Sequence, residues 1–174
     1  FPEVEVSWDE KDVMLYALGV GARPENGLDF IYEGKGPKVL PTYAVIPGGR
    51  SLGGLMSNVE MRLEMLLHGE QGIELFRALP AAAKVKVKGR ISEVWDKGKA
   101  AVIGVESTAS DGSGPMFKTH ATLFVRGAGG FGGERGPSGG DTATPPDRAP
   151  DAVVEDTTRP EQGAIYRLSG DRNP

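Results

Sequence analysis

The residues that could do chemistry most directly lie in the last nine positions of the chain, YRLSGDRNP, residues 166–174. Here Asp171 and Asn173 place a carboxylate and a carboxamide two residues apart, after a Ser-Gly step and before a proline. An aspartate near its ordinary pKa of about 3.9 is ionised at neutral pH. Asp171 is therefore available to accept a hydrogen bond or a proton from a water molecule or a histidine.

A short helix is expected to hold these polar residues. The apolar side chains within 164–168 suit a helix over residues 157–168, and Gly170 would end it before a tight turn. Polar side chains on a turn behind a packed helix are a common place for a catalytic group. The same composition also fits an ordinary helix end with solvated Asp171 and Asn173, because Asp, Asn, Gly and Pro are turn formers.

The composition indicates one globular domain and excludes several classes of protein. The chain has 174 residues, 39% hydrophobic and 25% charged, which is enough for a real core. A net charge of −4 gives no support to a nucleic-acid partner, and no apolar run approaches the ~20 residues of a membrane span. With no cysteine and two histidines, neither a disulfide framework nor a histidine-rich metal site is expected. The chain shows no signal-peptide pattern, although it starts at Phe1 rather than Met.

The first third of the chain predicts one helix and little regular structure after it. Ser7 and Glu10 have the spacing of a capping box, so a helix is expected from Ser7 to Gly19. Residues 28–32 resemble a short strand. Residues 41–46 begin with proline and could start a helix or form a strand. The following glycine-rich residues 47–54 contain no lysine at P-loop spacing and are interpreted as a loop.

The middle of the chain predicts an antiparallel sheet. Residues 68–76 are expected to be extended, because glycines interrupt any long helix there. Residues 84–94 alternate charged and apolar side chains, which is typical of a strand with one wet face. Two further strands over 100–108 and 116–126 follow across turns. Three such strands form a meander whose apolar face needs a covering helix.

Residues 127–150 are rich in glycine and proline and are interpreted as a linker or surface crossover. A short strand at residues 153–154 could follow. The predicted organisation is therefore a first unit over residues 1–126, a linker over 127–152 and the start of a second unit over 153–174.

A weak repeat relates the two ends of the chain. With an offset of 150 residues, four positions match in identity or type: Tyr16 with Tyr166, Leu18 with Leu168, Pro24 with Pro174, and Ser7 with Thr157. We infer a duplication whose second copy begins near Thr157. Gly21 stands opposite Asp171 and Arg23 opposite Asn173, so the first copy lacks the carboxylate. The first copy is predicted to bind substrate and the second to carry the catalytic group.

Many short motifs along the chain resemble one family in the same order. They are LYALGVGA (15–22), DFIYEG (29–34), LPTY (40–43), HGEQGIEL (68–75), LPAAAK (79–84), DKG (96–98), GAGGFGG (127–133), PPD (145–147) and YRLSGD-x-NP (166–174). The chain resembles the type-2, (R)-specific enoyl-CoA hydratases of the MaoC-like hot-dog family, in its N-terminal half plus the start of the hydratase motif. The resemblance implies an α+β hot-dog fold, in which an antiparallel sheet wraps around a helix, as the first half of a double hot-dog.

The resemblance also implies an activity and a set of site residues. In the family, the motif aspartate and a following histidine activate water and handle protons, and the asparagine helps to hold the site; these roles carry over to Asp171 and Asn173. The histidine is expected from a continuing polypeptide or a partner chain. The implied substrate is an acyl-CoA thioester, and no metal or redox cofactor is implied.

Further residues are candidates for binding that substrate. The family's H-G-E-Q and D-K-G motifs contact the acyl-CoA, which carries over to His68, Gly69 and Lys97, and Arg172 could reach a phosphate. Ordinary roles explain the same residues: His68 as a surface or capping side chain and Lys97 as a hairpin-turn lysine.

Three functions stay open at this point. The first is hydration of (2E)-enoyl-CoA to (3R)-3-hydroxyacyl-CoA in fatty-acid or steroid side-chain oxidation. The second is a non-catalytic acyl-CoA-binding subunit of a hetero-oligomeric hydratase, and the third is a hot-dog thioesterase. A homodimer or a double hot-dog assembly is expected, with a fused or partner dehydrogenase as an option. The resemblance places such a protein in the cytoplasm of a bacterium or the peroxisome of a eukaryote.

Overall fold

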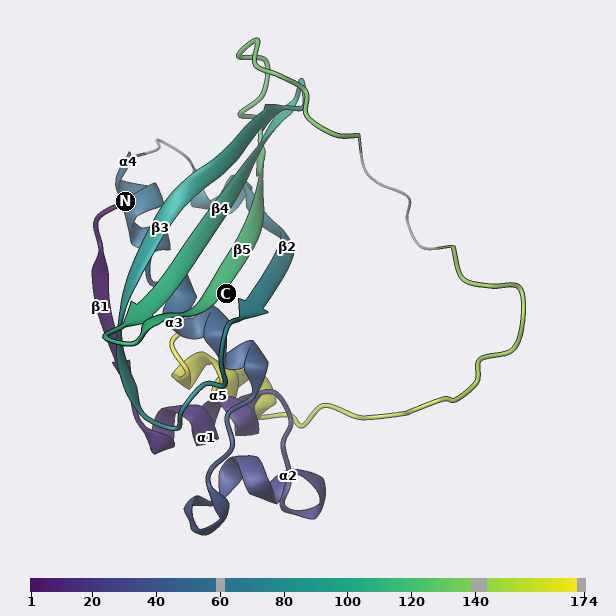
Figure 1. The fold of residues 1–174 in the computed structure, drawn as a ribbon. Coiled ribbons are helices and arrows are strands. Elements are labelled where there is room, and N and C mark those ends of the chain that lie inside the picture. The colour runs from purple at the N-terminus through teal and green to yellow at the C-terminus, as the bar shows by residue number, and fades with distance from the viewer. Residues whose placement is uncertain (59–61, 139–143, 172–174) are drawn as a thin grey trace.

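A five-stranded antiparallel sheet in the order β1-β3-β4-β5-β2 is the frame of the structure, a computed structural model that describes residues 1–58, 62–138 and 144–171 (Figure 1). The central strands β3, β4 and β5 follow one another through tight turns, and the outer strands come from earlier in the chain. The strands are β1 (Val4–Trp8), β2 (Leu66–Leu75), β3 (Ala83–Asp96), β4 (Ala100–Asp111) and β5 (Gly114–Arg126). The predicted meander and the extended segment near residues 68–76 are confirmed.

Strand β3 shows why the alternating sequence forms a half-buried strand. Val85 and Val87 are buried in the core, while the three lysines between and beside them are exposed. Lys84 and Lys86 pair with glutamates near the neighbouring strand β1, Glu5 at 2.8 Å and Glu3 at 3.1 Å. The lysine face is therefore a solvated sheet surface with weak ion pairs.

The helices gather on one face and at one end of the sheet (Figure 1). Helices α3 and α4 lie against the sheet, and α1, α2 and α5 lie at its lower end. The helices are α1 (Glu10–Gly19), α2 (Pro24–Ile31), α3 (Val45–Gly49), α4 (Leu52–Asn58) and α5 (Gln162–Leu168), with 3₁₀ turns at Glu33–Lys35, Pro41–Ala44 and Leu63–Met65.

Three predictions in the first third of the chain are wrong. Ser7 lies in β1, and the helix cap is Asp9. The Asp9 side chain accepts a hydrogen bond from the Asp12 amide at 3.2 Å, and the Asp12 side chain accepts one from the Asp9 amide at 3.0 Å. Residues 28–32 are not a strand but belong largely to α2, because Pro24 at the first helical position presets a helical start.

The glycine-rich residues 47–54 are not a loop either, since they form the end of α3 and the start of α4. Packing overrides the poor helix propensity of glycine here. A Cβ on Gly48 would lie 2.7 Å from Thr119 Oγ1 on β5, so only a glycine lets α3 approach the sheet this closely. Residues 41–46, which could have been a helix start or a strand, are helical.

The core has two parts. One part is centred on aromatic side chains: Tyr43 packs edge-on against Trp8 and Tyr16, with ring centroids 5.8 and 5.4 Å apart. Such edge-to-face pairs add to the free energy of simple area burial. The other part lies under α4, where Leu55 packs against four apolar side chains of β4 and β5, which are Ile103, Val105, Leu123 and Val125.

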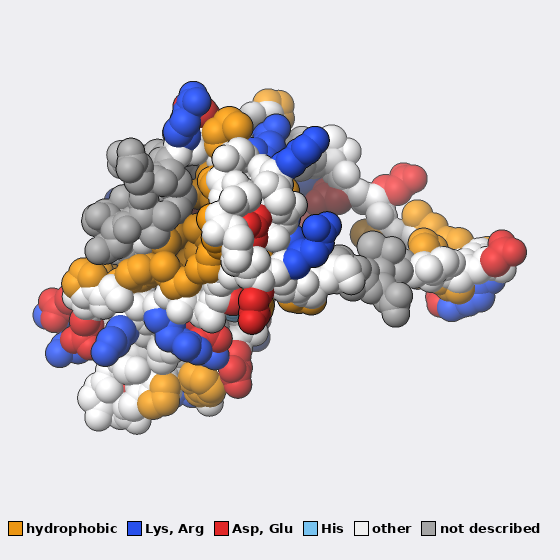
Figure 2. Space-filling view, turned by 90° about the horizontal axis from the view of Figure 1, so that it is seen from above, with side chains coloured by type: hydrophobic (Ala, Val, Ile, Leu, Met, Phe, Trp, Pro, Cys, Tyr) orange, Lys and Arg blue, Asp and Glu red, His pale blue; other side chains and the backbone are white. Residues whose placement is uncertain are grey.

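The predicted linker has two different halves. Residues 127–138 stay against the β3–β4 turn, where the Asp96 carboxylate accepts from the amides of Gly98, Gly130 and Gly132 at 2.8–2.9 Å. Residues 144–160 instead run outside the body of the molecule before they reach α5 (Figure 1), and Figure 2 shows this excursion extending away with hydrophobic and charged side chains along it. Val153 and Val154 are not a strand and are 73% and 90% exposed. Division into two hot-dog units at residue 153 stays a prediction.

Candidate functional site

Helix α5 returns the end of the described chain to helix α1 (Figure 1). A Cβ on Gly19 of α1 would lie 2.7 Å from the Tyr166 Cα of α5, so the missing side chain allows the two helices to touch. The rings of Tyr16 and Tyr166 lie 6.0 Å apart between centroids. The two tyrosines that match in the repeat therefore contact each other, while the duplication itself stays a prediction.

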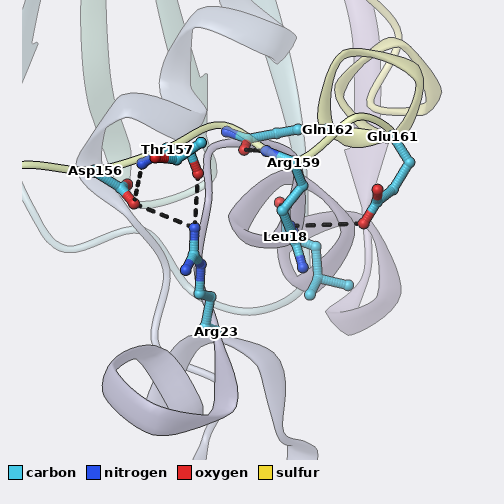
Figure 3. A network of polar contacts seen from close by, with 7 residues as sticks. All are labelled: Leu18, Arg23, Asp156, Thr157, Arg159, Glu161 and Gln162. Carbon is cyan, nitrogen blue, oxygen red and sulfur yellow. Dashed lines mark hydrogen bonds and ion pairs between the residues drawn. The ribbon is translucent and has the colours of Figure 1, made fainter.

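A polar network fixes the segment that leads into α5 (Figure 3). Arg23 Nη2 donates to the Asp156 carboxylate at 3.2 Å and to the Thr157 carbonyl at 3.0 Å. Arg159 Nη2 donates to the Leu18 carbonyl at the end of α1 at 3.0 Å. Arg23, which stands opposite Asn173 in the repeat, thus holds the segment that precedes the catalytic candidate.

Helix α5 begins at Gln162 rather than at the predicted Thr157, whereas its end follows the prediction from the sequence. Gly170 has φ +107, a left-handed conformation that glycine adopts without strain, and its amide bonds to the Arg167 carbonyl at 3.1 Å. The chain leaves the helix at this point and places Asp171 beside α3. The Arg50 guanidinium lies against Gly170, since a Cβ on Gly170 would be 2.9 Å from Arg50 Nη2.

A cavity of about 490 Å³ lies between α3, β2 and the end of α5. Its volume is in the range of small-molecule sites. Five apolar side chains form much of its wall: Val45, Ile46, Leu52, Leu66 and Leu123. Five polar side chains also line it, which are Arg50, His68, Gln71, Tyr166 and Asp171. An apolar cavity with a few convergent polar groups is the usual form of a ligand-binding site.

Tyr166 couples the aromatic core to this cavity. Burial raises its pKa to about 12, and the negative charge of Asp171 and a hydrogen bond to that carboxylate add to the rise. The phenol is therefore neutral at physiological pH and remains a hydrogen-bond donor to Asp171. Burial likewise raises the pKa of Tyr16, which lies behind Tyr166.

His68 and Gly69 lie on β2 at a β-bulge. The pairing of β2 with β5 shifts between His68 and Glu70, which leaves Gly69 as the extra residue. The His68 ring nitrogen Nε2 lies 2.9 Å from the Glu70 carbonyl, and the side chain faces the same cavity as Asp171. Gly69 is the neighbour of this wall but does not line the cavity itself. Substrate contact by either residue stays a prediction.

The structure does not bring Lys97 to the cavity. Lys97 lies in the β3–β4 turn, and its Nζ donates to the Pro137 carbonyl at 2.6 Å. Its predicted contact with an acyl-CoA stays a prediction. Arg172 and Asn173 lie outside the described residues.

Three cavity residues were missed from the sequence: Arg50, Gln71 and Tyr166. Gln71 Nε2 donates to the His120 carbonyl at 2.9 Å, so the side chain is fixed across β2 and β5. Gln71 and Tyr166 both lie within motifs that carried the resemblance, and only their side-chain directions were missing. Arg50 gave no signal because its segment resembled a loop.

Two negative findings concern the described residues only. Residues 1–58, 62–138 and 144–171 hold no group of three or more His, Cys, Asp or Glu side chains able to bind a metal ion. Within those ranges, no helix has the length and apolarity needed to cross a membrane.

Comparison with known proteins relates the chain to proteins that are named as hydratases. The sequence model described as the MFE-2 hydratase 2 N-terminal domain matches residues 6–127. The enoyl-CoA hydratase ChsH3 of Mycobacterium tuberculosis is 40% identical over 181 residues, covering 99% of this chain and 63% of its own length. The peroxisomal hydratase-dehydrogenase-epimerase of Neurospora crassa is 42% identical over 183 residues, covering 98% of this chain and 20% of its own length.

Solved structures agree with the sequence comparison. The MaoC-like dehydratase from Phytophthora capsici superposes with a TM-score of 0.80 at 30% identity, covering 99% of this chain and 63% of its own. Full-length peroxisomal multifunctional enzyme type 2 from Drosophila melanogaster superposes with a TM-score of 0.70 at 35% identity, covering 99% of this chain and 30% of its own length. The chain thus spans less than two thirds of these relatives. The predicted α+β hot-dog fold and the resemblance to type-2 hydratases are confirmed, and the chain belongs to the family of the MFE-2 hydratase 2 N-terminal domain.

Proposed function

We propose that this chain is the substrate-binding half of an enzyme that hydrates (2E)-enoyl-CoA to (3R)-3-hydroxyacyl-CoA in β-oxidation, and that it supplies Asp171 to the active site. One observation carries the proposal: Asp171 and His68, far apart in sequence, line one cavity of about 490 Å³ in a member of a hydratase family. Relatives named as enoyl-CoA hydratases support the same reaction.

The chemistry assigns a role to the carboxylate. Water adds across the C2–C3 double bond: its oxygen forms a bond to C3, one of its protons goes to a base, and a proton is delivered to C2. Negative charge grows on the thioester oxygen during this step and needs hydrogen-bond donors. Asp171 accepts from the attacking water or orients a histidine that does so. The neutral Tyr166 phenol donates to Asp171 and holds its position.

The remaining predicted residues complete the proposal. A histidine from another segment or chain works with Asp171, and Asn173 helps to hold the site. His68 and Gly69 bind the thioester or its pantetheine arm through the bulge on β2. Lys97 and Arg172 contribute positive charge toward the phosphates of CoA. The thioester itself is the substrate, and the reaction requires neither a metal nor a redox cofactor.

The wider setting is also part of the proposal. The active assembly is a double hot-dog, within one polypeptide or between chains. Relatives include a hydratase-dehydrogenase-epimerase, so a dehydrogenase fused to this chain or bound to it would consume the 3-hydroxyacyl product. Several relatives carry "peroxisomal" in their names, which supports that compartment for a eukaryotic protein, whereas a bacterial protein would act in the cytoplasm.

The test uses the complete protein that contains this chain. Crotonyl-CoA is added and the loss of conjugated thioester absorbance is followed, with chiral analysis of the product. Asp171→Asn is expected to lower kcat by about 10²–10⁴-fold, the usual contribution of a positioned acid or base. Asp147→Asn, which changes an exposed aspartate of the excursion, is the matched control and should leave kcat unchanged.

Other outcomes identify the competing functions. Release of free thiol instead of hydration would indicate a thioesterase. Activity that appears only after a separate hot-dog chain is added, and that survives Asp171→Asn, would indicate a non-catalytic binding subunit.

A further inference from the structure

We infer that Gly49 determines how deep the acyl-binding cavity is, and hence that it selects for long or bulky acyl groups. The inference rests on the proposed function and adds a specificity-determining residue to it. Gly49 is the last residue of α3, and it lines the cavity of about 490 Å³ between α3 and β2.

Three glycines of the α3–α4 segment differ in what a side chain would meet. Gly48 must be a glycine for packing, because its Cβ would lie 2.7 Å from Thr119 Oγ1. At Gly49 and at Gly53, no atom lies within 4 Å of the Cβ position apart from the chain neighbours and the backbone of the same helix. Gly49 lines the cavity, and Gly53 is exposed and lines neither cavity of this region. Of these three positions, only Gly49 combines open space with the cavity wall.

Gly49 also marks the point where two cavities meet. A second, smaller cavity of about 20 Å³ lies between α3 and the sheet, and four residues line both: Val45, Gly49, Leu52 and Gln71. The small cavity continues toward β4 and β5, where Val105 and Ala121 give it apolar walls. Because Gly49 has no side chain, the passage beside it stays open to the end of an acyl chain, and the small cavity beyond it has room for about one methyl-sized group.

The floor beyond Gly49 is compatible with a hydrocarbon tail. Ser107 lines the small cavity, and its hydroxyl is already paired with Ser51 Oγ at 2.5 Å in a buried contact. A hydroxyl with a protein partner does not require one from the ligand. The ligand end expected here is therefore apolar.

A side chain at position 49 would occupy this passage without disturbing the fold. Gly49 has no positive φ, and replacing a helical glycine by another residue raises helix propensity. A leucine would exclude the distal methylenes of a long acyl group while leaving the thioester end untouched. Each excluded methylene weakens binding by roughly fourfold, so loss of two reaches more than tenfold.

The experiment compares Gly49→Leu with Gly53→Leu in the complete protein, using crotonyl-CoA and hexadecenoyl-CoA. Gly49→Leu should lower kcat/KM for hexadecenoyl-CoA at least about tenfold and keep the value for crotonyl-CoA within about twofold. Gly53→Leu should change neither. Equal losses for both substrates, no loss for either, or the same loss in Gly53→Leu would overturn the inference.

A binding measurement separates this inference from the proposed reaction. Calorimetry with butanoyl-CoA and hexadecanoyl-CoA, which have no double bond to hydrate, should show the same chain-length selectivity of Gly49→Leu. If the protein hydrates neither enoyl-CoA, the proposed reaction fails, and the calorimetric comparison still decides the role of Gly49. Thermal unfolding of each variant tests whether the fold is kept. Gly49→Ala should change the chain-length selectivity in the same direction as Gly49→Leu, but by less.

Discussion

At the scale of single residues, the cavity depends on a carboxylate held by a phenol. Tyr166 has its ring against Tyr16, and its hydroxyl reaches Asp171 at the cavity wall. We expect the Tyr166 hydroxyl to position Asp171, the proposed reacting residue. Its contribution is therefore measurable as a change in kcat that leaves the fold in place.

Replacing Tyr166 with phenylalanine removes that single hydrogen bond. Loss of a bond to a charged acceptor is expected to lower kcat roughly tenfold, while KM changes little. Steady-state kinetics of the complete protein with crotonyl-CoA measures this effect. Tyr32→Phe, at a tyrosine that is 44% exposed on the surface, is the control. An unchanged kcat in Tyr166→Phe would show that the phenol does not position Asp171.

The Asp96 carboxylate holds the glycine-rich residues 127–134 through hydrogen bonds, so its charge should contribute to the stability of the protein. Backbone amides of Gly130, Gly98 and Gly132 hold its pKa below the ordinary value. A lowered folded-state pKa stabilises the protein above the unfolded-state pKa of 3.8, and that stability is lost as pH falls through the folded-state value.

Asp96→Asn is therefore expected to lower the thermal midpoint by a few degrees at pH 7 and much less near pH 3. Differential scanning calorimetry at the two pH values measures the difference, with Asp147→Asn as the exposed control. A loss of equal size at both pH values would mean that the charge of Asp96 is not what holds the segment.

At the scale of elements, the position of Asp171 depends on how α5 docks on α1. The two helices touch at Gly19, and Arg23 and Arg159 tie the preceding segment to the same end of α1. None of these contacts involves the sheet. Displacement of α5 should therefore reduce activity more than it reduces the stability of the sheet.

Gly19→Ala tests that docking, because the new methyl group would lie 2.7 Å from backbone atoms of Tyr166. Overpacking of this kind costs about 1–3 kcal/mol. We expect a lowered midpoint in urea and a fall in kcat larger than the stability loss explains. Gly163→Ala, on α5 at a site with nothing within 4 Å, is the matched control and should stabilise the helix slightly. Equal behaviour of the two variants would exclude close packing at Gly19.

The sequence predicted some elements much better than others. Strands β3, β4 and β5 were predictable because apolar and polar residues alternate along them. Helices α3 and α4 were not predictable, since glycine disfavours helices. The close approach of Gly48 to Thr119 on the sheet explains why a glycine stands in α3, and the sequence alone does not show this contact. Asp171 and His68 were identified through sequence motifs. Arg50 was not, because only the tertiary structure brings it to the cavity.

At the scale of the whole molecule, the aromatic residues Tyr16, Tyr43 and Tyr166 link the first helix, the core and the cavity. Burial is the main cause that raises the pKa of each phenol, to about 12 for Tyr166. A raised folded-state pKa gives stability that is fully present below the unfolded value of 10.0 and is lost as pH rises through the folded value. The free energy of unfolding should therefore fall between pH 10 and about 12.

Urea unfolding across that pH range measures the alkaline loss. In Tyr166→Phe the loss should become smaller but persist, because Tyr43 and Tyr16 still have to ionise on unfolding. A pH-independent free energy up to pH 12 would show that the three rings are accessible to solvent rather than buried.

The contacts of Arg23 have a consequence for the history of such a chain. In the predicted duplication Arg23 stands opposite Asn173, and its guanidinium binds the segment that precedes α5. The double substitution Gly21→Asp and Arg23→Asn, which gives the first copy of the predicted repeat the residues of the second, would remove these contacts. On the predicted duplication, the copy that lacks the carboxylate would serve to anchor the copy that has it.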